Sequence, residues 1–156
     1  MQIRIQKVLT SWLLSLSLVV QAGEVSQQQA LSFGKIALKN NNTVAIMQIT
    51  STGQILKDDA FVVLEAGQPG RFLLYDFPPF TQLSFSISPG STASSYSGGV
   101  TPTQFSIEPY LDFATQNTNA QGELILNLPA RLVTSGNGSV YPDGDYYRFF
   151  ELNIDY

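Results

Sequence analysis

The stretch that most restricts the fold is the C-terminal run from Asp145 to Tyr156, in which the character of the side chain changes at every second position. The even-numbered positions are apolar except for one arginine, namely Tyr146, Arg148, Phe150, Leu152, Ile154 and Tyr156. The odd-numbered positions are mostly acidic or amide, with Tyr147 and Phe149 as exceptions. Period-two alternation is typical of a half-buried β-strand, because successive side chains leave opposite faces of the pleat. The run therefore predicts a final strand with one face turned to a core.

Similar patterns recur earlier in the chain, and no helical periodicity follows residue 22. Leu83–Ser88 alternates apolar residues with serine, and Thr43–Ile49 is apolar on both faces, as suits a central strand. A change of phase at Gly34 predicts a β-bulge. Residues 123–134 place a longer apolar set on one face, namely Leu124, Leu126, Leu128, Ala130 and Leu132. About eight short strands separated by turn residues predict an all-β, immunoglobulin-like Greek-key sandwich.

The first 22 residues have the character of a secretory signal peptide. Arg4 and Lys7 give a basic start, Val8–Val20 is apolar, and the segment ends on the small residue Ala22. We therefore expect residues 1–22 to be removed and residues 23–156 to form a single exported domain. The expected localisation is the periplasm and then the cell surface.

Composition narrows the chemistry that such a domain can perform. The net charge of the whole chain is −4, which opposes binding to nucleic acid. The sequence has no cysteine and no histidine, so it lacks thiol chemistry, the commonest general base and the commonest metal ligands. No nucleophile–base pair or metal constellation can be assembled from the remaining residues. We therefore expect no enzymatic activity, no cofactor and no metal.

Three acidic groups have a functional interpretation beside an ordinary one. Asp143 and Asp145 could offer oxygens to Ca²⁺, but a strand-entry turn explains them better. Asp58 and Asp59 could act as a catalytic carboxylate pair, but adjacent residues in a strand point apart, so we expect them in a solvated turn. Asp76 lies among apolar neighbours, and we expect it at a strand end.

Aromatic and basic residues give two further hypotheses. Exposed tyrosines can stack on sugars, so Tyr96, Tyr110, Tyr141 and Tyr147 are candidates for glycan contact, although sandwich surface and core rims account for them as well. Arg148 is a charge on the apolar face of the final strand. It needs a buried partner in a closed sandwich, whereas near an open groove or a strand end it can extend to water.

Several segments, in order, resemble a family of secreted bacterial domains known as domain of unknown function 4402. The segments that carry the resemblance are Leu31-Ser-Phe33-Gly34-Lys-Ile36, Gly70-Arg-Phe72-Leu-Leu-Tyr, Gly122-Glu-Leu124-Ile-Leu126, Ala130-Arg-Leu132, and Gly144-Asp-Tyr146 through Ile154-Asp-Tyr156. The resemblance extends over essentially the whole of residues 23–156. The Gly-x-Tyr motif, the alternating strand and the terminal tyrosine also resemble subunits of chaperone–usher pili.

The pilus resemblance implies a sandwich that lacks one strand and a function in a fimbrium and in cell adhesion. In such subunits a groove beside the last strand is filled first by a periplasmic chaperone and then by a strand of the next subunit. This is β-augmentation, in which backbone hydrogen bonds give affinity and alternate side chains fill pockets. The resemblance therefore implies other pilus-type subunits and a chaperone as partners. The expected partner-strand and chaperone-binding residues are Tyr146, Arg148, Phe150, Leu152, Ile154 and Tyr156.

The segment Gly23–Ala30 departs from the pilus pattern. It is polar, we expect it to lie outside the strands, and Val25 is its one large apolar residue, so it has little to donate to a neighbouring groove. A tip or terminal subunit is therefore favoured over a shaft subunit. Two alternatives stay open: a self-sufficient carbohydrate-binding sandwich, with host or surface glycans as ligands, and a small outer-membrane β-barrel. The barrel is disfavoured by short strands and by prolines in the middle of the chain, because membrane strands need roughly 9–11 residues.

Overall fold

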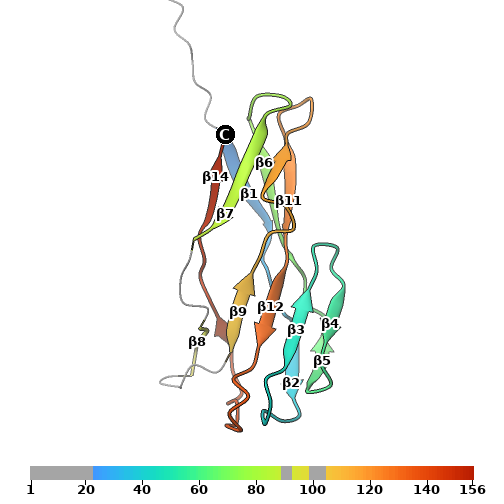
Figure 1. Cartoon of the computed structure of the whole chain (residues 1–156), viewed down its shortest axis with the longest axis vertical. Helices are drawn as coiled ribbons and strands as arrows, with labels where there is room; N and C mark the ends of the chain where they lie inside the picture. Colours follow the sequence, from blue (N-terminus) through green and yellow to red (C-terminus); the bar gives the residue numbers. More distant parts are fainter. Residues whose placement is uncertain (1–22, 89–92, 99–104) are drawn as a thin grey trace, which may run out of the picture.

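A computed structural model describes residues 23–88, 93–98 and 105–156 of the chain, and in them it contains only β-structure (Figure 1). The predicted signal peptide, residues 1–22, lies outside the described residues. Fourteen short strands are present among the described residues, all in antiparallel pairs. The predicted all-β sandwich is therefore confirmed, but its strands are more numerous and shorter than the eight expected.

Two three-stranded sheets form one half of the molecule, the upper half in Figure 1. The first has the order β1-β6-β11 and consists of β1 (Glu24–Gln29), β6 (Gly70–Tyr75) and β11 (Leu124–Leu128). The second has the order β10-β7-β14 and consists of β10 (Thr115–Asn117), β7 (Gln82–Ile87) and β14 (Leu152–Asp155). In both sheets the neighbours are far apart in sequence, as crossing connections between layers require.

The other half contains one larger sheet and two strand pairs. The larger sheet has the order β4-β3-β12-β9 and consists of β4 (Ile55–Lys57), β3 (Ile46–Ile49), β12 (Ala130–Val133) and β9 (Ser106–Pro109). The pairs are β2 (Lys35–Leu38) with β5 (Phe61–Glu65), and β8 (Ser95–Tyr96) with β13 (Tyr146–Tyr147). The prediction that Thr43–Ile49 contains a central strand is confirmed, because β3 lies between β4 and β12.

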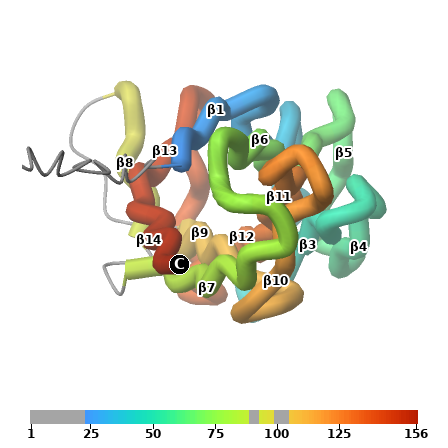
Figure 2. The backbone as a smooth tube through the Cα atoms, turned by 90° about the horizontal axis from the view of Figure 1, so that it is seen from above, coloured from blue at the N-terminus to red at the C-terminus, as the bar shows by residue number. Residues whose placement is uncertain are grey.

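The arrangement of the sheets leaves β1 and β14 on the same side of the molecule. Figure 2, which looks down the long axis, shows β1 and β14 on one side, and Figure 1 shows them next to each other near the C-terminus. Each is an edge strand, since β1 pairs only with β6 and β14 only with β7 among the described residues. The two layers therefore end, on this side, in two strands that do not pair with each other.

Two apolar clusters fill the interior, one in each half. The upper cluster is built from Leu74, Phe77, Leu83, Phe85 and Leu126. The lower cluster is built from Ala45, Met47, Phe61, Phe105, Ile107 and Leu132. The apolar face predicted for residues 123–134 supplies both, because β11 and β12 follow each other directly and contribute Leu126 to one cluster and Leu132 to the other. Burial of such side chains is the main stabilising term of the fold.

The irregularity predicted at Gly34 is present. The pairing of β2 with β5 shifts register between Lys35 and Ile36, and Gly34 has a φ of 75°. A Cβ atom at this position would lie 2.2 Å from the backbone oxygen of Glu65. Glycine is needed here both for the left-handed backbone conformation and for the close approach of the neighbouring strand.

Three local predictions are wrong. Glu24–Gln29, in the polar segment expected to lie outside the strands, forms β1, because pairing uses backbone groups and an edge strand tolerates polar side chains on both faces. The Ser/Gly-rich composition of Pro89–Gly99 predicts a surface loop, but its described residues include β8. The final run does not form one strand: Arg148–Glu151 belongs to no sheet and separates β13 from β14.

A buried asparagine ties two loops together at the lower end. The Asn41 side chain is 5% exposed, and its Nδ2 atom donates to Ser135 Oγ, Asn137 Oδ1 and Ser139 O at 2.9, 3.0 and 3.1 Å. Its Oδ1 atom accepts a hydrogen bond of 2.8 Å from the backbone N–H of Gly136. The amide therefore has partners for both of its polar atoms, which is the condition for burying such a group without a large cost.

Among the described residues, no helix has the length and apolar character needed to cross a membrane.

Candidate strand-pairing site

The free edge of β14 presents backbone groups that no other described strand uses. Ser88 N–H donates to Glu151 O at 3.0 Å, and β14 then pairs with β7 from Leu152 opposite Ile87 to Asp155 opposite Ser84. Hydrogen bonding alternates along an antiparallel pair. Because Glu151 bonds toward β7, Asn153 also bonds toward it, whereas the N–H and C=O of Leu152 and Ile154 point to the open side. These groups are a template for a further strand.

The side chains on the inner face of β14 are only partly covered. Leu152 and Ile154 pack against the upper cluster but keep intermediate exposure. On the neighbouring strand β7, Leu83 is 0% exposed and Phe85 is 5% exposed. The cluster is therefore fully buried at these two residues and only partly covered at Leu152 and Ile154. An edge strand with unpaired backbone groups and partly exposed apolar side chains is what β-augmentation requires.

Phe77 closes one end of this open side. Its ring is 6% exposed, lies with its centroid 5.1 Å from the Tyr156 ring in an edge-on arrangement, and also packs directly on Gly23. A Cβ atom on Gly23 would come within 2.3 Å of the ring, so no larger residue fits there without movement. The residue before β1 and the residue after β14 therefore meet on one aromatic ring.

Arg148 stands four residues before the start of β14, and its guanidinium extends to β9. Its Nη1 atom donates to the backbone oxygen of Ile107 in β9. Its Nε atom is enclosed and has no hydrogen-bond partner. From the sequence, we expect Arg148 either to have a buried partner or to extend to water. In the structure its partner is a backbone carbonyl, and the side chain is only half-buried.

The segment that contains Arg148 also turns two aromatic rings outward. Phe149 is 88% exposed, Tyr147 is 46% exposed, and their ring centroids lie 5.7 Å apart. Phe150, between Arg148 and β14, is half-buried. The alternation seen in the sequence is therefore retained across the break between β13 and β14, although no strand pairs with this segment among the described residues.

The six residues predicted to contact a partner strand do not form one continuous row. Leu152 and Ile154 line the open edge, and Tyr156 lies at the Phe77 end of that edge. Tyr146 instead packs in the lower cluster, with its ring centroid 4.9 Å from Phe105. Burial and then the neighbouring Tyr96 raise the pKa of the Tyr146 phenol above its ordinary value of 10.0.

The four tyrosines proposed for glycan contact are not gathered on one surface. The ring centroids of Tyr96 and Tyr146 lie 5.0 Å apart, and Tyr141 packs against the lower cluster with its centroid 4.0 Å from Phe105. Tyr110 accepts a hydrogen bond of 2.7 Å from Gln48 Nε2 and lies under the guanidinium of Arg131. Tyr147 is the one of the four that pairs with an exposed ring.

The acidic candidates are placed as their ordinary interpretation predicted. Asp58 accepts a hydrogen bond of 2.8 Å from the backbone N–H of Ile46, which is a structural use in a turn. Asp76 is exposed at the end of β6 and has a φ of 60°. Within the residues that the structure describes, no three acidic side chains are grouped so as to hold a metal ion.

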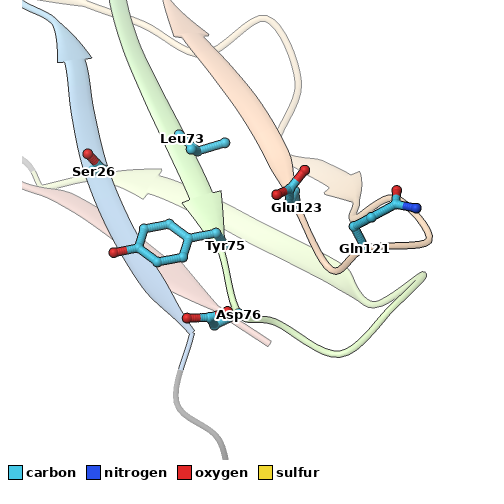
Figure 3. Close-up of a pocket in the computed structure, with 6 residues that line it drawn as sticks. All are labelled: Ser26, Leu73, Tyr75, Asp76, Gln121 and Glu123. Atoms are coloured by element: carbon cyan, nitrogen blue, oxygen red, sulfur yellow. The ribbon is translucent and has the colours of Figure 1, made fainter.

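A shallow hollow on the outer face of the β1-β6-β11 sheet was not anticipated from the sequence. Figure 3 shows the Tyr75 ring lying across this face, with Glu123 and Gln121 on one side. The hollow has a volume of about 280 Å³, and its lining residues are Ser26, Leu73, Tyr75, Asp76, Gln121 and Glu123. Tyr75 donates a hydrogen bond of 2.5 Å to Glu24 Oε2, and this bond raises the pKa of the phenol above its ordinary value of 10.0.

No family model, curated protein or solved structure matches the chain. The functional conclusions below therefore depend on the sequence pattern and on the geometry of the open edge.

Proposed function

We propose that this protein is an exported, non-enzymatic structural or adhesion protein that accepts a β-strand from another polypeptide along the free edge of β14. The function is that of a subunit at the tip or terminus of a pilus-type fibre. The partners are a periplasmic chaperone, which covers the edge before assembly, and another subunit, which replaces it. An uncovered apolar edge promotes aggregation, which is the physical reason for a chaperone.

One observation carries the proposal: among the described residues β14 pairs with β7 alone, while its inner side chains Leu152 and Ile154 are incompletely buried. The strand on the other layer, β1, is itself an edge and makes no pair with β14. A strand laid along β14 would bond the free backbone groups of Leu152 and Ile154 and cover their side chains. Because β1 is already paired with β6, residues 24–29 are occupied within their own domain, which favours an accepting role over a donating one.

Amide hydrogen exchange of residues 23–156 tests the proposal. In the isolated protein the N–H groups of Leu152 and Ile154, which point to the open side, are expected to exchange much faster than those of Asn153 and Asp155, which point to β7. Adding a peptide of alternating valine and threonine is expected to slow exchange at Leu152 and Ile154 and leave Asn153 and Asp155 nearly unchanged.

The matched control is a peptide of the same composition with its valines clustered, which cannot present one apolar face. Equal protection of all four amides before any peptide is added would show that the edge is already covered. Failure of the alternating peptide to protect Leu152 and Ile154, at concentrations where it remains soluble, would also contradict strand acceptance.

The hollow around Tyr75 favours glycan binding as a second function. An aromatic ring with carboxylates and an amide around it is the combination that stacks on a sugar and bonds its hydroxyl groups. Tyr75 provides the ring, and Asp76, Gln121 and Glu123 provide the polar groups. A glycan array with the folded domain tests this, and Tyr75→Ala is expected to abolish any signal while Tyr147→Ala leaves it unchanged. Sugar binding that survives Tyr75→Ala would exclude this site.

A further inference from the structure

Arg148 has no acidic counter-charge among the described residues. Its guanidinium donates a hydrogen bond to the uncharged backbone carbonyl of Ile107. Burying a charge without a counter-charge is costly, and the cost rises as surrounding water is removed. A strand that covers the open edge would remove that water.

The carbonyl that Arg148 meets fixes the position of the guanidinium. Tyr110 N–H donates to Pro129 O at 3.1 Å, and the pairing of β9 with β12 continues with Glu108 opposite Arg131. Because hydrogen bonding alternates, the C=O of Ile107 points away from β12 to the free edge of β9. Arg148 therefore bridges from the final segment to the free edge of β9, and it is held there by a backbone group.

The remaining donors of Arg148 define what it can bind. Nη1 is engaged, and Nε is enclosed by the protein's own atoms. Nη2 has no hydrogen-bond partner among the described residues of this half-buried side chain, so it is the donor left for a partner. A guanidinium nitrogen prefers a carboxylate oxygen as its acceptor, and charge-assisted hydrogen bonds of this kind are about twice as strong as neutral ones.

We infer that the strand accepted along the β14 edge carries an aspartate or glutamate at the position that faces Arg148. The inference rests on the function proposed above and adds the chemistry of the partner. The inner face of such a strand carries apolar side chains opposite Leu152 and Ile154 and a single acidic side chain opposite Arg148. A single charge in an otherwise apolar strand also fixes the register, because a slip of two residues would leave both charges unpaired.

A peptide scan tests the inference. The probes are the alternating valine–threonine peptide and variants in which one inner valine at a time is replaced by aspartate, or by asparagine as the uncharged match. Affinity is measured by titration calorimetry with residues 23–156. One aspartate position is expected to bind about ten-fold tighter than its asparagine match, which corresponds to about 1.4 kcal/mol. The Arg148→Met variant is expected to bind the aspartate peptide and its asparagine match with equal affinity.

The outcomes separate the two claims. Peptides that bind with equal affinity whether they carry aspartate or asparagine would overturn the acidic partner and leave strand acceptance intact. Peptides that do not bind at all would overturn the proposed function itself. An aspartate preference that is the same at every position, that persists in Arg148→Met, or that acetate alone removes by competition would show attraction of any anion and no strand-borne partner for Arg148.

Discussion

The strands β12 and β14 have the same pattern in the sequence but different surroundings in the structure. Both have an apolar residue at every second position, Ala130 and Leu132 in β12 and Leu152 and Ile154 in β14, and both turn these side chains inward. β12 lies between β3 and β9, and its inner residues Ala130 and Leu132 are 0% and 3% exposed. In the part of the chain that the structure describes, β14 pairs only with β7, and Leu152 and Ile154 keep intermediate exposure.

The difference shows what alternation does and does not determine. It determines which side chains share a face, because the period of a strand is two. It does not determine how many neighbours the strand has, and the number of neighbours decides whether the face is sealed. The same pattern can therefore complete a core in one place and leave a strand-binding edge in another.

The largest expected effect contrasts truncations in the two strands. Leu132→Ala removes a fully buried side chain and is expected to lower the free energy of unfolding by about 2–5 kcal/mol. Ile154→Ala removes a half-covered one, and the expected loss is roughly half of that. Urea unfolding of both variants measures the contrast. Equal losses would mean that the β14 edge is as well sealed as the middle of the sheet.

A second prediction concerns the lower half of the molecule, where Asn41 joins two loops. Asn41→Ala removes four hydrogen bonds and leaves the backbone N–H of Gly136 without its partner. The expected loss of unfolding free energy is about 1–3 kcal/mol. The matched control is Asn42→Ala, on an exposed neighbour, which is expected to change stability by less than about 0.5 kcal/mol. Similar results for the two variants would show that the buried amide does not hold the loops together.

A third prediction sharpens the open side. In the isolated domain Arg148→Met loses the bond to Ile107 but also removes an enclosed, unpartnered Nε. These effects oppose each other, so unfolding free energy is expected to change by less than about 1 kcal/mol, in contrast to Leu132→Ala. Thermal unfolding of the two variants checks this. A loss of several kcal/mol in Arg148→Met would show that the residue serves the domain's own stability.

The smallest effect is expected at high pH. The hydrogen bond to Glu24 raises the pKa of Tyr75 above its ordinary value of 10.0. Just above pH 10 the Tyr75 hydroxyl therefore keeps its proton in the folded state and loses it in the unfolded state. Stability from this bond is therefore complete below pH 10 and is lost as the pH rises through the folded pKa. Tyr75→Phe is expected to weaken the fall in unfolding free energy between about pH 9 and 11. An identical fall in both proteins would mean that the bond makes no net contribution.

The sequence predicted the class of fold because alternation and turn residues depend on local chemistry. It placed β3 in the middle of a sheet, assigned the inward face of residues 123–134 and located the irregularity at Gly34. It missed β1, since Gln27, Gln28 and Gln29 give no apolar signal and their strand is formed by backbone pairing with β6. Pairing partners depend on tertiary structure, which no local pattern contains.

The candidate site was predictable in part. Alternation identified Leu152 and Ile154 and singled out Arg148 as an unusual charge. It could not show that Tyr146 leaves this row for the lower cluster, because the break at Arg148–Glu151 follows from where β7 ends and carries no glycine or proline. The hollow around Tyr75 was not predictable either, since it combines residues from β1, β6 and the turn before β11.

The antiparallel pairing of β14 with β7 has a mechanical consequence. Bonds in such a pair run perpendicular to the strands, so tension applied along β14 loads them together in shear instead of opening them one after another. Phe77, in contact with both Gly23 and Tyr156, would pass part of that load from the last residue to the start of the first strand. A pull through the chain end is thus distributed over both layers at once.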